Sequence, residues 1–140
     1  MSKVILITGT SSGFGRTIAE KLHSEGYTVI GTSRNAEKIN SDYLTVKLDI
    51  NNYDASKSEV DKIIKKHGKI DILVNNAGIN ITGPTETMKM DDVKRVFDTN
   101  FFSQLNLIQT VLPYMRSKKM GLIINITSIA GYLGLPFWSA

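Results

Sequence analysis

The 140-residue sequence contains no cysteine and only three prolines. Without cysteine neither a disulfide framework nor a thiolate metal site can form, and this composition suits a reducing cytoplasm. No hydrophobic run approaches the length of a membrane span, and the longest early run, Val4–Ile7, leads directly into a glycine-containing segment. These absences predict a cytoplasmic protein that has no membrane anchor and no metal site.

A strong excess of charge of one sign is also lacking, because 17 Lys and Arg stand against 13 Asp and Glu, a formal net charge of +4. The lysines fall in short clusters without interleaved aromatic residues, which favours solvated helix faces over a nucleic-acid patch. His23 and His67 lie near predicted helix ends and are read as structural. Hydrophobic residues make up 41% and charged residues 21% of the chain, which predicts one globular domain over residues 1–140.

Short apolar runs alternate with amphipathic stretches along the whole chain. The runs predict strands at residues 4–8, 27–32, 44–48, 70–75 and 122–126, and the 3.6-residue pattern predicts helices at 13–24, 53–67 and 90–118. The last stretch is either two helices or one bent helix, and Pro113 should distort its C-terminal turns. Strands joined by crossover helices predict an α/β fold, a doubly wound parallel sheet of the Rossmann type in three α/β/α layers, ending after its fifth strand.

A glycine-rich segment joins the first predicted strand to the first helix. Gly9 allows a sharp exit from the strand, Gly13 lets the backbone approach a phosphate, and Gly15 lets the helix lie close to the sheet. A diphosphate would then rest on amide groups at the helix N-terminus. The alternative is an ordinary tight turn. The candidate cofactor-binding residues of this segment are Thr8, Gly9, Ser11, Ser12, Gly13, Phe14 and Gly15.

The spacing T-G-x-x-x-G-x-G is similar to the cofactor motif of the short-chain dehydrogenase/reductase family, and three further motifs match that family in order. Asn100 stands where the family has a helix-kinking asparagine, and Ser128 stands where it has a catalytic serine. The weaker alternatives are a helix boundary at Asn100, a cap at a strand end for Ser128, and a turn for the remaining motif. The third motif resembles the family's N-N-A-G segment, which flanks the cofactor: Asn75, Asn76, Ala77 and Gly78.

The end of the second strand points to the choice of nicotinamide cofactor. An acidic residue there accepts hydrogen bonds from the adenosine ribose of NAD, whereas a cation accommodates the 2′-phosphate of NADP. Here Ser33 and Arg34 occupy this place, which favours NADP over NAD unless Arg34 is an ordinary surface arginine. Asp49, followed by Ile50, resembles the aspartate that receives the adenine amino group; the alternative is a turn residue beside Asn51.

The family resemblance implies hydride transfer between NADP(H) and a small-molecule carbonyl or alcohol substrate. In the family a tyrosine protonates the carbonyl oxygen, and a lysine four residues later lowers the pKa of that tyrosine. Ser128 would hold the carbonyl oxygen and Asn100 would hold a helix bend. The family spacing puts the tyrosine directly after Ala140. Three tyrosines, Tyr43, Tyr53 and Tyr114, do have a lysine four positions on, but all three come before Ser128 and so lie far from the family position. The chain by itself is therefore expected to be inactive, and the alternative is a non-catalytic NADP-binding or assembly module.

The resemblance also implies a homodimer or homotetramer formed through the long helix near residues 100–118. Its second apolar set, Phe102, Leu107 and Val111, suits a partner surface, and core packing explains it equally well. In the family, residues equivalent to 131–140 border the substrate pocket, and their apolar character suggests an apolar carbonyl or alcohol. Ordinary packing explains this apolar character equally well. The fifth strand is expected to form a sheet edge with uncovered apolar side chains.

Overall fold

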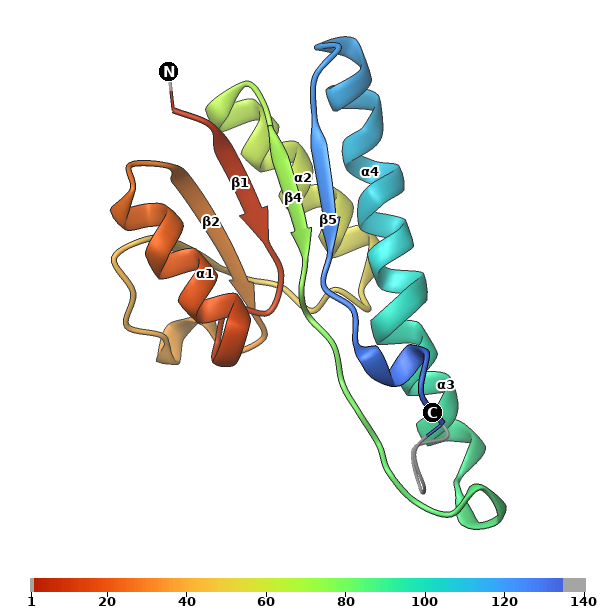
Figure 1. Ribbon diagram of the computed structural model, residues 1–140. Helices are drawn as coiled ribbons and strands as arrows, with labels where there is room; N and C mark the ends of the chain where they lie inside the picture. Colours follow the sequence, from red (N-terminus) through yellow and green to blue (C-terminus); the bar gives the residue numbers. More distant parts are fainter. Residues whose placement is uncertain (1, 135–140) are drawn as a thin grey trace.

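The computed structural model describes residues 2–134 and contains one parallel sheet (Figure 1). The strand order β3-β2-β1-β4-β5 follows from two crossovers to one side of β1 and two to the other. The predicted parallel sheet is therefore confirmed, with strand ends shifted by at most two residues. The strands are β1 (Val4–Ile7), β2 (Thr28–Ser33), β3 (Leu44–Lys47), β4 (Ile72–Asn75) and β5 (Leu122–Asn125).

Helices cover both faces of the sheet at β1, which explains why all residues of this strand are apolar. Figure 1 shows α1 (Gly13–Ser24) over the face of β1 and β2 nearer the viewer, with α2 (Tyr53–His67) on the opposite face. Alternate residues of β1 enter two separate cores, because successive side chains of a strand point to opposite faces. Ile5 and Ile7 pack with the α1 side, whereas Val4 and Leu6 pack with α2 and α4 (Ser103–Ser117).

The predicted long helix at 90–118 is one bent assembly of three segments. Helix α3 (Met90–Phe97) runs into a π-helical turn, Asp98–Phe102, which runs into α4. The irregularity thus surrounds Asn100. Helix α4 continues through Pro113 to Ser117, so the proline does not end the helix, and the expected distortion of its C-terminal turns stays a prediction. Pro113 is exposed, so the Gln109 carbonyl that loses its helical partner can bond water instead.

The packing of α4 decides whether its second apolar set belongs to the core or to a partner surface. Leu107 and Val111 are fully buried against the sheet and α2, so core packing is correct for them and the partner-surface interpretation is wrong. Only Phe102 of that set is exposed. The exposed apolar side chains of this helical assembly are instead Met90, Phe97, Phe101, Phe102 and Leu105.

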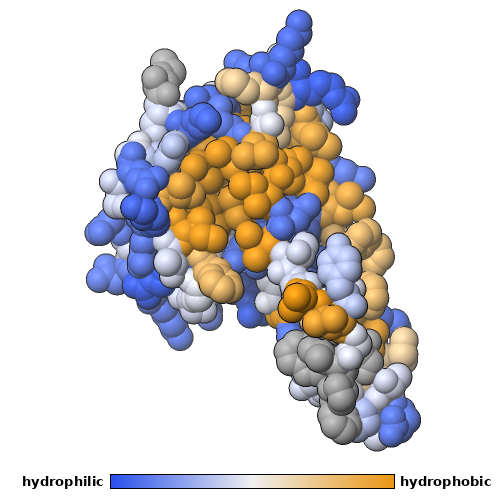
Figure 2. Space-filling view, viewed as in Figure 1, coloured by the Kyte–Doolittle hydropathy of each residue, from blue (hydrophilic) through white to orange (hydrophobic). Residues whose placement is uncertain are grey.

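Among the residues that the structure describes, none covers the face of β4 and β5 that lies beside α1. Figure 2 shows a broad apolar surface on this side, and side chains of β5 contribute to it: Leu122 is 50% exposed and Ile124 is 38% exposed. Within residues 2–134, β5 is the last strand of the sheet on that side, as expected. No helix in this described part of the chain is long and apolar enough to cross a membrane.

Candidate functional site

A cavity of about 630 Å³ opens at the carboxyl ends of β1, β2, β3 and β4. Ligands of open parallel sheets bind at this edge, beside the point where the strand order reverses. Three stretches that are far apart in the sequence meet there: the loop after β1, the ends of β2 and β3, and the segment after β4. The predicted residues that line the cavity are Gly9, Ser11, Ser12, Phe14, Gly15, Ser33, Arg34, Asp49, Ile50, Asn76, Ala77 and Gly78.

The N-terminus of α1 faces this cavity without a side-chain cap. Ser12 is the N-cap residue, its side chain accepts no hydrogen bond from the helix, and the first turn contains no acidic residue. The first amide groups of a helix have no partner within the helix, and the helix dipole makes this end attractive to anions. Gly13 does not line the cavity, but its φ of 57° is a left-handed conformation that favours glycine.

Asn76 ties the loop after β1 to the segment after β4. Its Nδ2 donates to the carbonyls of Thr8 (2.9 Å) and Gly9 (3.1 Å). Gly15 lies against this amide, because a Cβ on Gly15 would collide with Asn76 Nδ2 and with the Gly9 carbonyl. Gly9 has a φ of 71°, and a Cβ there would lie 2.8 Å from the Cα of Ala77. The close approach that Gly15 permits is therefore to the loop after β4.

Two predicted cofactor residues support the site from behind and do not line the cavity. Thr8 is buried, and its hydroxyl accepts from the amides of Asn76 (3.0 Å) and Ala77 (2.9 Å). Asn75 is also buried, at the end of β4, and its Nδ2 donates to Asn125 Oδ1 at 2.9 Å. These bonds hold the ends of β1, β4 and β5 together.

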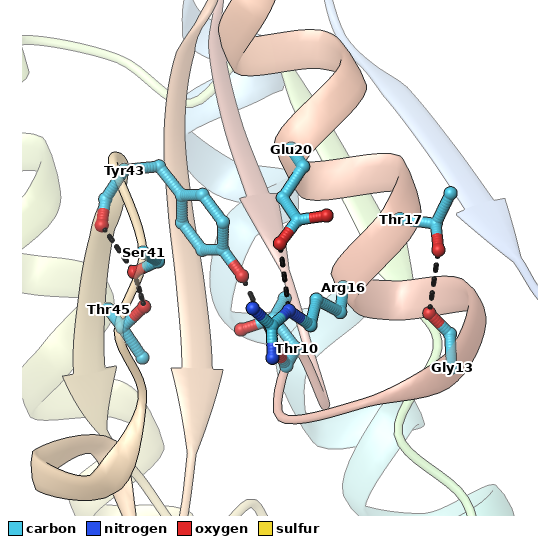
Figure 3. Close-up of polar contacts among 8 residues, drawn as sticks. All are labelled: Thr10, Gly13, Arg16, Thr17, Glu20, Ser41, Tyr43 and Thr45. Carbon is cyan, nitrogen blue, oxygen red and sulfur yellow. Dashed lines mark hydrogen bonds and ion pairs between the residues drawn. The ribbon is translucent and has the colours of Figure 1, made fainter.

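The loop after β1 is also held from the side of β3. The hydroxyl of Tyr43 donates to the carbonyl of Thr10 at 3.3 Å, and Figure 3 shows this ring reaching across β2 toward the loop. Gly31 leaves room for the ring, because a Cβ on Gly31 would lie 2.7 Å from Tyr43 Cε2. On the other side of the loop, Thr17 Oγ1 donates to the Gly13 carbonyl at 3.2 Å. The contact of Tyr43 was not predicted from the sequence, because it depends on how β2 and β3 pair.

The two residues expected to choose the cofactor lie together at the cavity. Ser33 is buried, and its Oγ accepts from the amide of Asn35 at 3.1 Å, which fixes the turn after β2. Arg34 follows with an exposed side chain. Within residues 2–134 no carboxylate forms an ion pair with Arg34. Its guanidinium is therefore available to an anion in the cavity.

Asp49 combines the two roles that its residue type suggested. Its Oδ1 accepts from the amide of Asn51 at 3.1 Å, as in a turn, and the residue also lines the cavity. Several lining residues were not predicted from the sequence, because only the tertiary fold brings them here. They come from the turn after β3, from the segment after β4, and from α3 with its π-helical turn. The missed residues include Asn51, Ile79, Asn80, Ile81, Arg95 and Thr99.

The structure gives different local contacts for the two predicted catalytic residues, Asn100 and Ser128. Asn100 lies within the π-helical turn, where its Oδ1 accepts from the Ile79 amide (2.9 Å) and its Nδ2 donates to the Ile79 carbonyl (2.8 Å). Ser128 does not line the cavity; its Oγ accepts from the Ala130 amide at 3.2 Å and caps a short 3-10 turn. Of the predicted pocket border at 131–140, residues 135–140 lie outside the described residues.

The sheet order, the glycine-rich strand-to-helix loop and the cavity at the carboxyl ends define a doubly wound Rossmann-type fold. The family model for short chain dehydrogenases matches residues 3–140. The chain therefore belongs to the short-chain dehydrogenase family, a family of oxidoreductases, and the resemblance inferred from its motifs is confirmed.

Individual relatives agree with this assignment. The chain is 41% identical over 135 residues to a 3-ketodihydrosphingosine reductase of Bacteroides thetaiotaomicron, covering 96% of this chain and 50% of that protein. It is 36% identical to a 3-oxoacyl-(acyl-carrier-protein) reductase of Thermotoga maritima, covering 96% of this chain and 58% of that protein. A metagenomic short-chain oxidoreductase solved in complex with NADP superposes with a TM-score of 0.91 at 32% identity, covering 98% of this chain and 67% of the other. The chain thus spans about half the length of the curated relatives it matches.

Proposed function

We propose that this chain provides the NADP-binding part of an oxidoreductase that transfers hydride between NADP(H) and a carbonyl or alcohol. The observation that carries the proposal is the cavity at the carboxyl ends of the strands. The uncapped N-terminus of α1 faces this cavity beside the loop after β1, and Arg34 lines it at the end of β2. These two features match the two anionic groups of NADP, its diphosphate and its 2′-phosphate.

The residues around the α1 N-terminus fit a diphosphate. Glycines leave the backbone of the loop accessible, no acidic side chain of the first turn repels an anion, and no side chain caps the helix. Gly9, Ser11, Ser12 and Gly15 line the cavity beside these amides and would hold the diphosphate. Asn76 would keep the loop in the shape that this contact requires, through its bonds to Thr8 and Gly9.

The end of β2 supports NADP over NAD. No carboxylate follows this strand at the place where one would accept hydrogen bonds from a ribose, and Arg34 lines the cavity there. A guanidinium can donate two parallel hydrogen bonds to a phosphate, a strong charge-assisted interaction. Asp49 and Ile50, at the end of β3, would contact the adenine. The solved relative that contains NADP supports the same choice.

For the reaction itself, the cofactor supplies or accepts the hydride, and we assign two positions of this chain. Ser128 would hold the carbonyl oxygen of the substrate, and Asn100 would hold the π-helical turn in place through Ile79. Both curated relatives are named as reductases of a 3-oxo or 3-keto compound, which supports a 3-oxo substrate. The whole protein is further proposed to act in the cytoplasm as a homodimer or homotetramer, with residues 1–140 as one cofactor-binding domain.

The test is to measure NADPH and NADH binding to Arg34→Ala by calorimetry. Charge-assisted hydrogen bonds contribute about 1.5–3 kcal/mol, so NADPH affinity should fall by roughly ten- to a hundredfold while NADH affinity stays within about twofold. Lys38→Ala is the matched control, because Lys38 is an exposed cation four residues later that does not line the cavity. Equal losses for both nucleotides in Arg34→Ala would contradict the assignment of NADP.

A further inference from the structure

Asn51 joins the turn after β3 to the π-helical turn. Its Nδ2 donates to Thr99 Oγ1 at 3.1 Å, and its Oδ1 accepts from the hydroxyl of Ser103 at 2.7 Å. Thr99 and Ser103 are both buried, whereas Asn51 itself reaches the surface of the cavity. The single amide therefore satisfies two buried hydroxyl groups on successive turns of one helical assembly.

The π-helical turn is consequently fixed from two directions. On one side Asn100 pairs with both backbone groups of Ile79. On the other side Asn51 bonds Thr99 within the turn and Ser103 directly after it. A π-helical turn is rare and is less favourable than a regular α-helix, so it persists only where surrounding contacts specify it. The two sets of contacts together provide this specification.

Asn51 is also bonded to the proposed adenine contact. The carboxylate of Asp49 accepts from the Asn51 amide at 3.1 Å, so a ligand that orders Asp49 also orders the backbone that carries the Asn51 side chain. A continuous series of hydrogen bonds therefore leads from the end of β3 to the π-helical turn. Asp49, Asn51, Thr99 and Ile79 all line the same cavity.

We propose that Asn51 is a positioning residue, which holds the π-helical turn that carries Asn100 and couples occupancy of the adenine end of the cavity to that turn. The coupling rests on the proposed function, because it requires an adenine nucleotide beside Asp49. The holding role rests on the two side-chain bonds alone.

Hydrogen exchange of the Ile79 amide, measured in the complete protein, tests the proposal, because this amide donates to Asn100. Asn51→Ala removes both bonds to the helical assembly, and exchange at Ile79 should become roughly tenfold faster. Asn51→Asp should restore slow exchange, because a carboxylate can accept from both hydroxyl groups. In the wild type 2′,5′-ADP, which lacks the nicotinamide half, should slow exchange at Ile79; in Asn51→Ala it should bind without slowing it.

Asn52→Ala is the matched control. Asn52 caps α2 by accepting from the Ala55 amide at 3.0 Å, so its loss lowers global stability without touching the π-helical turn. If Asn51→Ala speeds exchange at Ile79 no more than Asn52→Ala does, the holding role is overturned. If 2′,5′-ADP binds but slows exchange equally in the wild type and Asn51→Ala, the coupling is overturned. If 2′,5′-ADP fails to bind the wild type, the proposed function fails with the coupling, and the ligand-free comparison still decides the holding role.

Discussion

Replacing Gly15 with alanine should damage both the fold and cofactor binding, because it acts on the contact that shapes the glycine-rich loop. A Cβ at this position would collide with Asn76 Nδ2 and with the carbonyl of Gly9. These two groups are also the donor and acceptor of the 3.1 Å hydrogen bond between the loop after β4 and the loop after β1. The added methyl group must therefore break this bond or push α1 away from the sheet.

The size of the effect follows from these two losses. Forcing an extra methyl group into a packed site costs about 1–3 kcal/mol, and a net hydrogen bond contributes about 1 kcal/mol. Gly15→Ala should therefore lower the free energy of unfolding by about 2–4 kcal/mol. Since the α1 amides would move with the loop, the dissociation constant of NADPH should rise tenfold or more. For the loss of stability Gly13→Ala is the control, because a Cβ there meets no atom within 4 Å and adds only the strain of its φ of 57°.

Urea unfolding followed by circular dichroism, with NADPH titration of the same samples, measures both effects. A double-mutant cycle adds a sharper test: Asn76→Ala removes one of the two colliding groups, so Gly15→Ala should cost less in that background than in the wild type. The reasoning would be refuted if Gly15→Ala lost less than about 0.5 kcal/mol and bound NADPH normally. Strict additivity of the two substitutions would also refute it.

Two further predictions concern residues away from the loop. Burial opposes the charging of Asp71, but hydrogen bonds from Lys69 (2.8 Å) and from the Val4 amide (2.7 Å) outweigh it and hold the pKa of this carboxyl below its ordinary value. The stability that this lowered pKa contributes is present above the unfolded pKa of about 3.9, and it is lost as pH falls through the lower folded pKa. In Asp71→Asn the free energy of unfolding, measured by urea titration, should therefore fall less steeply as pH is lowered below about 4. An unchanged slope in that acidic range would contradict this prediction. Ser128→Ala should leave the NADPH dissociation constant unchanged, because Ser128 lies outside the cavity, while kcat of the complete protein falls on the order of 10²-fold; a large loss of NADPH affinity would argue against the assigned role.

Much of the fold was predictable because its signals are local. Buried parallel strands read as continuous apolar runs, and amphipathic helices read as a 3.6-residue period, so each needs only its own residues to be recognised. The face of a helix that meets the sheet was less readable where apolar residues surround the helix. In α4 both faces carry apolar side chains, and only the packing showed that Leu107 and Val111 are core while Leu105 is exposed.

The candidate site was readable in the segments where its residues are neighbours in the chain. The glycine-rich loop, the Ser33 and Arg34 pair and the Asn75 to Gly78 motif each occupy consecutive positions, and all three reach the cavity edge in the structure. Arg95 and Thr99 have no such signal. They belong to the helical assembly that begins at Met90, and a long segment separates this assembly from the end of β4. Their place at the cavity therefore depends on how the helical assembly packs back against the sheet.

The sequence by itself therefore determined the order of the strands and helices, the strand-to-helix loop and the cation after β2, because short-range periodicity and turn chemistry specify these features. The tertiary structure alone decided that Asn76 bonds the loop after β1 and that Asn51 bonds Thr99 and Ser103. It also decided that the irregular turn around Asn100 is a π-helical one. These contacts join residues from different crossovers. They form only because parallel strands bring all their carboxyl ends, and the loops that follow them, to the same edge of the sheet.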